Sequence, residues 1–316
     1  MKKEQSIFST MKTFALSHST IVFLIFLLTF NCIITPNFIN ATTLWNLIVQ
    51  TTPLLLVALG MTFVISSGGI NIAVGSLMAV AGMLVVRLME VTSIGIALAI
   101  TIFTITLVGG VIGFVIVRFD IQPIIITLAF LIGARGIARM LGYGSVLHYD
   151  SAEFGMLTLT RIKNVPIQLI YVIVFAAIFI FIAKKTTFAR YVEAIGDNRN
   201  ASLLAGIRVN ESLIAVYALS GLMAALAGIL TVSRAGAADP KTVGNSLEMY
   251  AIAAVAIGDT KMSGGKAKVV GSIIGACIMQ LITITINMNN IAYEWSLTIS
   301  TIVIIGAVVL QNIKGE

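Results

Sequence analysis

The side chains that could perform nucleophilic, acid–base or metal chemistry are few in this chain and stand far apart. His18 and His148 have no metal-ligand spacing around them, and Cys32 and Cys277 lie in separate apolar runs. Zinc sites and disulfide frameworks need clustered ligands or several cysteines. The phosphate-binding pattern G-x-x-x-x-G-K-[ST] is also missing from the sequence. The sequence therefore predicts no catalytic residue, no metal site and no cofactor, and ATP hydrolysis is not expected on this chain.

A second set of polar side chains lies in or beside long apolar runs, where hydrogen bonding is the chemistry open to them. Ser67, Asn71, Gln122 and Thr127 offer neutral donors and acceptors there. An uncharged hydroxylated solute needs such partners, because each unpaired buried hydroxyl costs about 1–3 kcal/mol. We therefore expect these four residues to line a substrate pathway. The alternative is that they serve only a tight turn and helix packing.

The composition indicates that the helices that position these groups lie in a membrane. Hydrophobic residues make up 58% of the 316 positions and charged residues 10%, against about 25% charged in a soluble domain. The mean hydropathy is +1.04. The net charge of +7 forms no dense basic block interleaved with aromatic residues, so no nucleic-acid partner is expected.

Apolar windows of about 20 residues, the length of a transmembrane helix, predict ten spans. They lie near 20–36, 44–66, 71–90, 94–117, 121–141, 166–183, 213–234, 248–260, 267–288 and 294–312. The window at 248–260 is too short to cross a bilayer, so it is expected to be a half-helix protected by its neighbours. The predicted fold is all-α: a polytopic membrane protein with about ten transmembrane helices, some of them broken, in one domain over 1–316.

The loops that carry most of the lysine and arginine residues alternate with loops that carry few. Cytoplasmic loops are enriched in these residues, which sets the expected orientation. The segment 1–19 and the loop 184–212 are predicted to be cytoplasmic. The loops 142–165 and 235–247 are predicted to lie outside.

Two internal matches suggest a repeat. The Ser-Gly-Gly at 67–69 recurs at 263–265 and is followed at the same spacing by Val-Gly-Ser, whereas 108–113 matches 270–275. By the predicted spans, the first match is parallel and the second is inverted. Inverted repeats are a common way to build transporters, so the inverted repeat is preferred. The alternative is a chance similarity of glycine-rich helix ends.

Two arginines, Arg135 and Arg139, lie four residues apart in the fifth predicted span. An arginine inside a span faces the bundle interior, a cavity or the membrane interface. Because this pair is near the outer end of the span, both side chains are expected to extend toward the lipid headgroups.

The longest polar segment, 184–212, carries the run E-A-I-G-D-N at 193–198, then Ala201 and Gly206. This E-A-x-G-x-N-x-x-A pattern resembles the cytoplasmic loop of sugar permeases in ATP-binding-cassette importers. The resemblance implies that a short helix over 198–204, ended by Gly206, docks onto a separate ATPase. The residues that it assigns to this coupling are Glu193, Gly196, Asp197, Asn198, Ala201 and Gly206.

Two further segments carry the resemblance. The residues 58–62 and 67–76 are similar to the family signature A-L-G-M-T…S-G-G-I-D-L-S-V-G-S, with Asn71 in place of the aspartate and Ala73 in place of a serine. Replacing the aspartate removes a group that only accepts hydrogen bonds, so solute preference or a local ion pair is expected to differ.

The segment 251–265 is similar to the second signature, D-A-I-A-A-V-V-I-G-G-T-S-L-S-G-G. Here Tyr250 replaces the aspartate, Asp259 a glycine and Lys261 a serine. Asp259 and Lys261 are expected to pair at the cytoplasmic mouth, a solvated contact worth less than about 1 kcal/mol.

The resemblance is to ribose-, xylose- and galactose-type permeases of bacterial inner membranes. It implies two permease copies, or this chain with a paralogous permease, a cassette ATPase inside and a solute-binding protein outside. The substrate would be a pentose or hexose; a nucleoside, an autoinducer sugar or a branched-chain amino acid is the alternative. An ion-coupled secondary transporter is less favoured, because Glu248 and Asp259 are at the ends of predicted spans.

Overall fold

Long apolar helices dominate the computed structural model, which describes residues 19–292, 295, 298–299, 301–302 and 305–306. In this part of the chain six helices are long and apolar enough to cross a membrane. They are α3 (Ala41–Ser66), α5 (Ile94–Phe119), α6 (Pro123–Leu141), α8 (Gln168–Lys185), α11 (Val209–Ala235) and α13 (Val269–Met288). Three shorter apolar helices accompany them: α2 (Ser19–Ile34), α4 (Val74–Met89) and α12 (Leu247–Ile257).

The all-α membrane fold is thus confirmed, and each of the first nine predicted spans overlaps one of these helices. The tenth predicted span, 294–312, lies largely outside the described residues, as does the predicted cytoplasmic segment 1–19 apart from Ser19. The outward faces of α5, α6 and α8 expose large apolar side chains, among them Phe103, Ile132, Ile173 and Phe181. Such faces suit contact with lipid or with another membrane subunit.

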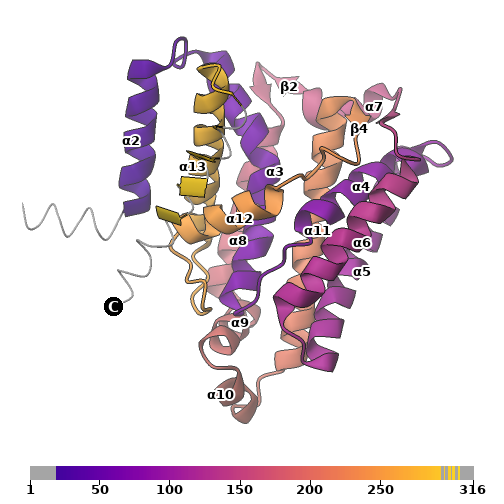
Figure 1. Ribbon diagram of the computed structural model, residues 1–316, viewed down its shortest axis with the longest axis vertical. Coiled ribbons are helices and arrows are strands. Elements are labelled where there is room, and N and C mark those ends of the chain that lie inside the picture. The colour runs from indigo at the N-terminus through magenta and orange to yellow at the C-terminus, as the bar shows by residue number, and fades with distance from the viewer. Residues whose placement is uncertain (1–18, 293–294, 296–297, 300, 303–304, 307–316) are drawn as a thin grey trace, which may run out of the picture.

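The connecting loops, with the short helices and strands in them, lie at two opposite ends of the bundle (Figure 1). One end, called here the strand end, holds α7 (Ala152–Leu159), β1 (Leu147–His148), β2 (Arg161–Ile162), β3 (Val165–Pro166) and β4 (Ala237–Ala238). There β1 pairs antiparallel with β4, and β2 pairs with β3. Helix α7 lies in a segment that was expected to be loop; Ser151 caps its first turn and its Phe154 is fully buried.

The other end, called here the lysine-rich end, holds α9 (Thr187–Asp197), α10 (Arg199–Leu204) and the loop 258–268. Its lysines are Lys184, Lys185, Lys261, Lys266 and Lys268. The predicted topology requires 142–165 and 235–247 to share one side and 184–212 to share the other with 258–268. The structure groups the loops in this way; that the lysine-rich end is cytoplasmic remains a prediction.

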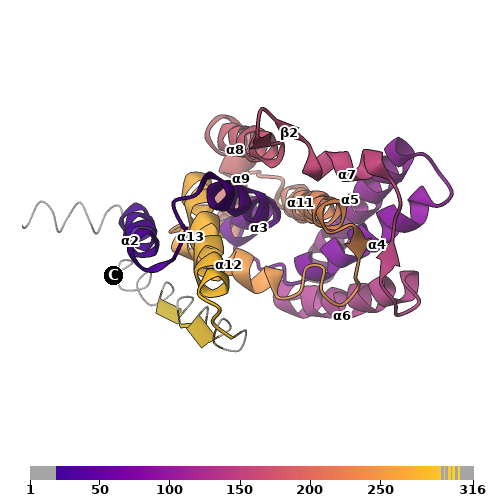
Figure 2. The same ribbon diagram turned by 90° about the horizontal axis from the view of Figure 1, so that it is seen from above.

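Helix α11 is the centre of the bundle and packs between α3, α4 and α5 (Figure 2). Two glycines of α5, Gly109 and Gly113, allow a close approach. A Cβ on Gly109 would stand 3.1 Å from the Cα of Gly221, and one on Gly113 would stand 2.8 Å from the Cα of Ile214. Larger side chains at these positions would separate the two helices.

Helices α4 and α12 are half-helices that begin at the same place and run apart. At their starts, Gly75 and Gly244 are in backbone contact. Helix α4 then runs along α11 toward the strand end, with Gly82 against Val232, whereas α12 ends at Gly258 near the lysine-rich end. Each half-helix follows a long spanning helix and a non-helical segment. This opposite course agrees with the inverted match rather than with the parallel one.

Candidate functional site

The turn between α3 and α4, residues 67–73, brings non-helical backbone into the bundle. Gly68 takes the left-handed conformation with φ +82°, which favours glycine. A Cβ on Gly69 would overlap the hydroxyl of Tyr217, so a larger residue there would displace this buried side chain. Ser67 is buried and donates its hydroxyl to the carbonyl of Val64 at 2.7 Å. The paired glycines thus allow close packing, and Ser67 helps to end α3.

Asn71 lies fully buried in this turn and bonds only within the subunit. Its Nδ2 donates to Ser220 Oγ on α11 at 3.1 Å, and its Oδ1 accepts the backbone N–H of Ala73 at 3.1 Å. An aspartate could accept at both places but could donate at neither. The substitution that was noted in the sequence therefore changes the direction of a buried hydrogen bond to α11, a partner that the sequence does not reveal.

Thr127 and Gln122 differ in their exposure. Thr127 on α6 is buried, and its hydroxyl lies 3.3 Å from the carbonyls of Ile70 and Ile124, so it ties α6 to the turn. Gln122 precedes the first turn of α6 with an exposed side chain that makes no capping bond. Three of the four residues expected in a pathway thus have their polar groups engaged inside the subunit, and Gln122 alone of the four is exposed.

Arg135 is turned into the bundle, so the expectation that it extends toward the headgroups was wrong. Its guanidinium donates to the carbonyls of Pro240 at 3.2 Å, Val243 at 2.8 Å and Gly244 at 3.3 Å. These carbonyls belong to the non-helical segment before α12, where, among the described residues, only that of Gly244 also accepts a backbone bond, from the N–H of Leu247 at 3.5 Å. Backbone acceptors at membrane depth must be satisfied inside the protein, and Arg135 does this. Arg139, four residues later, is exposed.

Glu248 lies in the first turn of α12, where its Oε2 is buried without a hydrogen-bond partner among the described residues. A Cβ on Gly75 would overlap this oxygen, so the carboxylate lies against the start of α4. Arg135 attracts it electrostatically, and the amino end of α12 also favours a negative charge.

The depth of Glu248 corrects its assignment to the end of a span. Helix α4 starts beside the middle of α11, since one turn later Met78 is in contact with Gly228. Glu248 is at the end of a helix, but this helix begins inside the bundle.

A junction of backbones joins α9 to both Gly-Gly turns at the lysine-rich end. A Cβ on Gly196 would overlap the carbonyl oxygen of Ser66 and stand 2.6 Å from the N of Gly265. Gly265 donates its N–H to the same Ser66 carbonyl at 2.9 Å. Glu193 accepts the N–H of Ala267 at 3.0 Å. Glu193 and Gly196, which were assigned to ATPase coupling, therefore contact other parts of this subunit.

Helix α10 confirms the short helix expected over 198–204. Asn198 caps it by accepting the N–H of Ala201 at 2.9 Å, and Gly206 follows it in the left-handed conformation with φ +76°. The apolar side chains of this helix include two exposed ones: Ala201 is exposed, and Leu204 has 91% of its surface accessible. Asp197, at the end of α9, is exposed as well. An apolar helix tip that nothing in the subunit covers is available to a partner.

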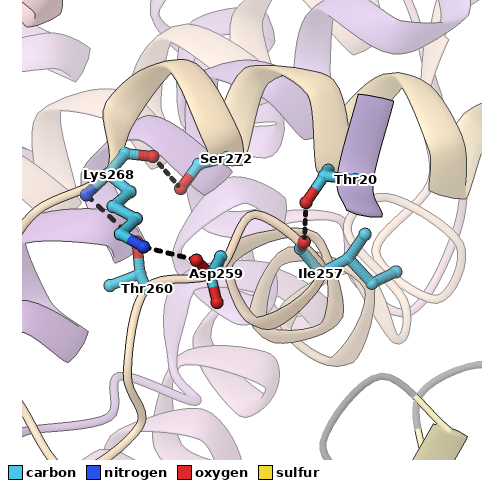
Figure 3. A network of polar contacts seen from close by, with 6 residues as sticks. All are labelled: Thr20, Ile257, Asp259, Thr260, Lys268 and Ser272. Carbon is cyan, nitrogen blue, oxygen red and sulfur yellow. Dashed lines mark hydrogen bonds and ion pairs between the residues drawn. The ribbon is translucent and has the colours of Figure 1, made fainter. Parts of the chain in front are cut away.

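Asp259 forms an ion pair with Lys268, so the expected pairing with Lys261 was wrong (Figure 3). The left-handed backbone of Asp259, φ +65°, turns the chain, and its side chain meets the residue that precedes α13. The N–H of Lys268 donates to Thr260 Oγ1 at 3.2 Å. The partner of Asp259 is therefore nine positions away, at the other end of the loop 258–268, and not two positions away.

Comparison with known proteins places this architecture in a family. Residues 43–308 match the family described as branched-chain amino acid transport system / permease component. The ribose import permease protein RbsC of Escherichia coli K12 is 33% identical over 310 residues, covering 96% of each chain. The fructose import permease protein FruF of Bifidobacterium longum is 35% identical over 269 residues, covering 82% of this chain and 74% of FruF. No solved structure shows a significant match. The chain therefore belongs to the family of branched-chain amino acid transport system permease components.

Proposed function

We propose that this chain forms the translocation pathway of an ATP-binding-cassette importer for a monosaccharide, a pentose or a hexose. Similarity to permeases for several monosaccharides carries the proposal: beside ribose and fructose, relatives are named for galactofuranose and D-allose. The ribose permease and the fructose permease are each matched over most of their length. The same permease machinery thus serves both pentoses and hexoses, which is why the class is proposed and no single sugar.

The meeting of α4 and α12 inside the bundle supports a transport role. Discontinuous helices whose ends meet at membrane depth commonly build the solute sites of transporters. We assign contact with the solute to Gln122 and to exposed backbone near the 67–73 turn. Ser67, Asn71 and Thr127 belong to the pathway as the residues that shape this turn. Neutral donors hold a sugar more weakly than charged ones, and weak binding suits a surface that must release it.

We assign one partner protein to each end of this subunit. We assign the loop 184–212 to the cytoplasm, where α10 docks into the ATPase through the exposed Leu204 and Ala201, with Asp197 beside them. The strand end receives the solute-binding protein from outside. A second copy of this chain, or a paralogous permease, completes the pathway in the bacterial inner membrane.

Reconstituted transport tests the proposal. The chain would be placed in liposomes with the ATPase and the binding protein encoded beside it, and uptake of labelled pentoses, hexoses, nucleosides and branched-chain amino acids would be compared. We expect ATP-dependent uptake of one or more monosaccharides. If an amino acid or a nucleoside is taken up and no sugar is transported, the proposed substrate class is wrong and the chain is an importer subunit for that other solute.

Ion-coupled transport is the second candidate, because Glu248 provides a carboxylate at membrane depth. Replacing Glu248 with Gln separates the two. An ion-coupled transporter would lose uptake, and an ionophore would abolish uptake in the unmodified protein. We expect instead that uptake follows ATP, that it withstands the ionophore, and that Glu248→Gln retains substantial transport.

A further inference from the structure

A cavity of about 470 Å³ opens at the lysine-rich end between α2, α8 and α13. Helix α13 packs against both α2 and α8, which stand on different sides of it (Figure 2). The cavity also borders the loop 258–268 and Glu193 of α9. It does not include any of the residues assigned above to the solute pathway.

The cavity lies where three apolar helices, α2, α8 and α13, start or end. Thr20, in the first turn of α2, donates its hydroxyl to the carbonyl of Ile257 at 2.9 Å and so fixes the start of α2 at the level of the end of α12 (Figure 3). Lys184 is in the last turn of α8, and Val269 begins α13. In a bilayer, the ends of spanning helices lie at the level of the lipid headgroups.

The charge left unpaired in the cavity is positive. Five charged side chains line it: Lys184, Lys266, Lys268, Glu193 and Asp259. Lys268 is paired with Asp259, whereas Glu193 keeps its negative charge while one of its oxygens accepts the N–H of Ala267, so the three lysines and two carboxylates leave a net charge of +1. Lys184 and Lys266 are exposed and form no ion pair with any described residue. Two free ammonium groups therefore share one cavity.

The remaining walls of the cavity are apolar. They include Ile21, Ile180, Ala183, Val270 and Ile274, and two of these, Ile21 and Val270, are exposed, at 42% and 48%. A cavity that combines cationic side chains with an open apolar wall fits an amphiphile better than a small soluble anion. Basic pockets between helices on the cytoplasmic side of membranes bind anionic lipid headgroups in this way.

We propose that this cavity binds the phosphodiester headgroup of an anionic phospholipid. Lys184 and Lys266 contact the phosphate, and the first part of an acyl chain lies along the apolar wall toward Ile180 and Ile274. The lipid lies between α2 and α8, both of which pack against α13. The site is independent of the solute that the permease carries.

Native mass spectrometry of the full chain in detergent, titrated with phosphatidylglycerol or phosphatidylethanolamine, tests the site. We expect tighter binding of phosphatidylglycerol. Because each lysine near an anionic headgroup contributes about 5-fold in affinity, the double variant Lys184→Gln/Lys266→Gln should weaken this binding about 30-fold. The control Lys185→Gln/Lys261→Gln removes the same charge from neighbouring exposed positions outside the cavity and should retain the affinity.

Two further experiments distinguish binding in the cavity from nonspecific electrostatic attraction of the lipid to lysines. Ala183→Phe narrows the cavity without changing its charge and should also weaken binding, whereas inorganic phosphate should raise the melting temperature of the unmodified chain far less than the lipid does. Equal binding of the two lipids, equal loss in both double variants, or full replacement of the lipid by phosphate would each overturn the proposal. The comparison of the two lipids on the unmodified chain decides even if a variant is unstable.

Discussion

Removing the side chain of Arg135 should destabilise the fold, because it is turned into the bundle and bonds to backbone there. Its guanidinium satisfies the carbonyls of Pro240, Val243 and Gly244, and its charge balances the buried carboxylate of Glu248. Replacing Arg135 with Ala leaves three acceptors and one negative charge without this partner. We expect the segment before α12 to loosen, and the protein to lose stability before it loses the ability to insert.

The size of the effect can be estimated from the bonds. Side-chain hydrogen bonds inside membrane bundles are worth about 0.6 kcal/mol on average and about 1.7 kcal/mol at most. Three such bonds give a loss of about 2–5 kcal/mol, or at least about 30-fold in the unfolding equilibrium. Arg135→Lys should fall between, because an ammonium keeps the charge but lacks the planar fork that reaches several carbonyls.

Unfolding by SDS, followed by the helical signal in circular dichroism, measures this free energy. Arg139→Ala is the matched control, since Arg139 is on the same helix and exposed, and it should leave the midpoint unchanged. Adding Glu248→Gln to Arg135→Ala should recover part of the loss, because it removes the stranded charge. If Arg135→Ala and Arg139→Ala unfold at the same SDS fraction, the three bonds contribute nothing measurable and the reasoning fails.

Three further changes address the lysine-rich end. Gly196→Ala forces a methyl group against the carbonyl of Ser66 and should cost about 1–3 kcal/mol, read from the same SDS titration, while a normal midpoint would show that the backbones are not in contact. Leu204→Ser should leave stability unchanged, because Leu204 is 91% exposed, but should weaken co-purification of the ATPase; undiminished co-purification would exclude Leu204 from docking. Asp259→Gly removes both a left-handed non-glycine residue and its partly exposed pair with Lys268, effects of about 1 kcal/mol each that oppose one another, so the midpoint should hardly move; a large loss would show that the pair matters more than an exposed contact should.

Hydropathy was sufficient to place the apolar helices, because a bilayer requires predominantly apolar side chains along every span. The helix α10 was also accessible, since a capping Asn198 and a left-handed Gly206 mark its ends within nine positions of one another. The residues that start and end such a helix are neighbours in the sequence, so the sequence alone is sufficient to recognise it. The same holds for the half-helix α12, which was recognised by its short apolar window.

Contacts between distant segments could not be read in this way. Arg135 was expected at the headgroups because the carbonyls it serves are more than 100 positions away, at 240–244. Asp259 was matched to Lys261 by proximity in sequence, whereas its left-handed backbone directs it to Lys268. Glu248 was placed at the end of a span because hydropathy does not reveal that α12 begins in the middle of the bundle. In each case the missing information was the path of a non-helical segment.

The junction at the lysine-rich end connects the proposed docking helix to both half-helices. Helix α9 contacts the turn before α4 through Ser66 and the turn after α12 through Gly265 and Ala267. The contacts of Gly196 with Ser66 and Gly265 are backbone to backbone, so no flexible side chain is available there to absorb a shift of α9, whereas the bond to Ala267 is made by the Glu193 side chain. A displacement of α10 by a bound ATPase must therefore move both turns together or break the junction. Since the half-helices meet at Gly75 and Gly244, the same displacement reaches the centre of the bundle from two sides, which is where a solute on the proposed pathway would pass.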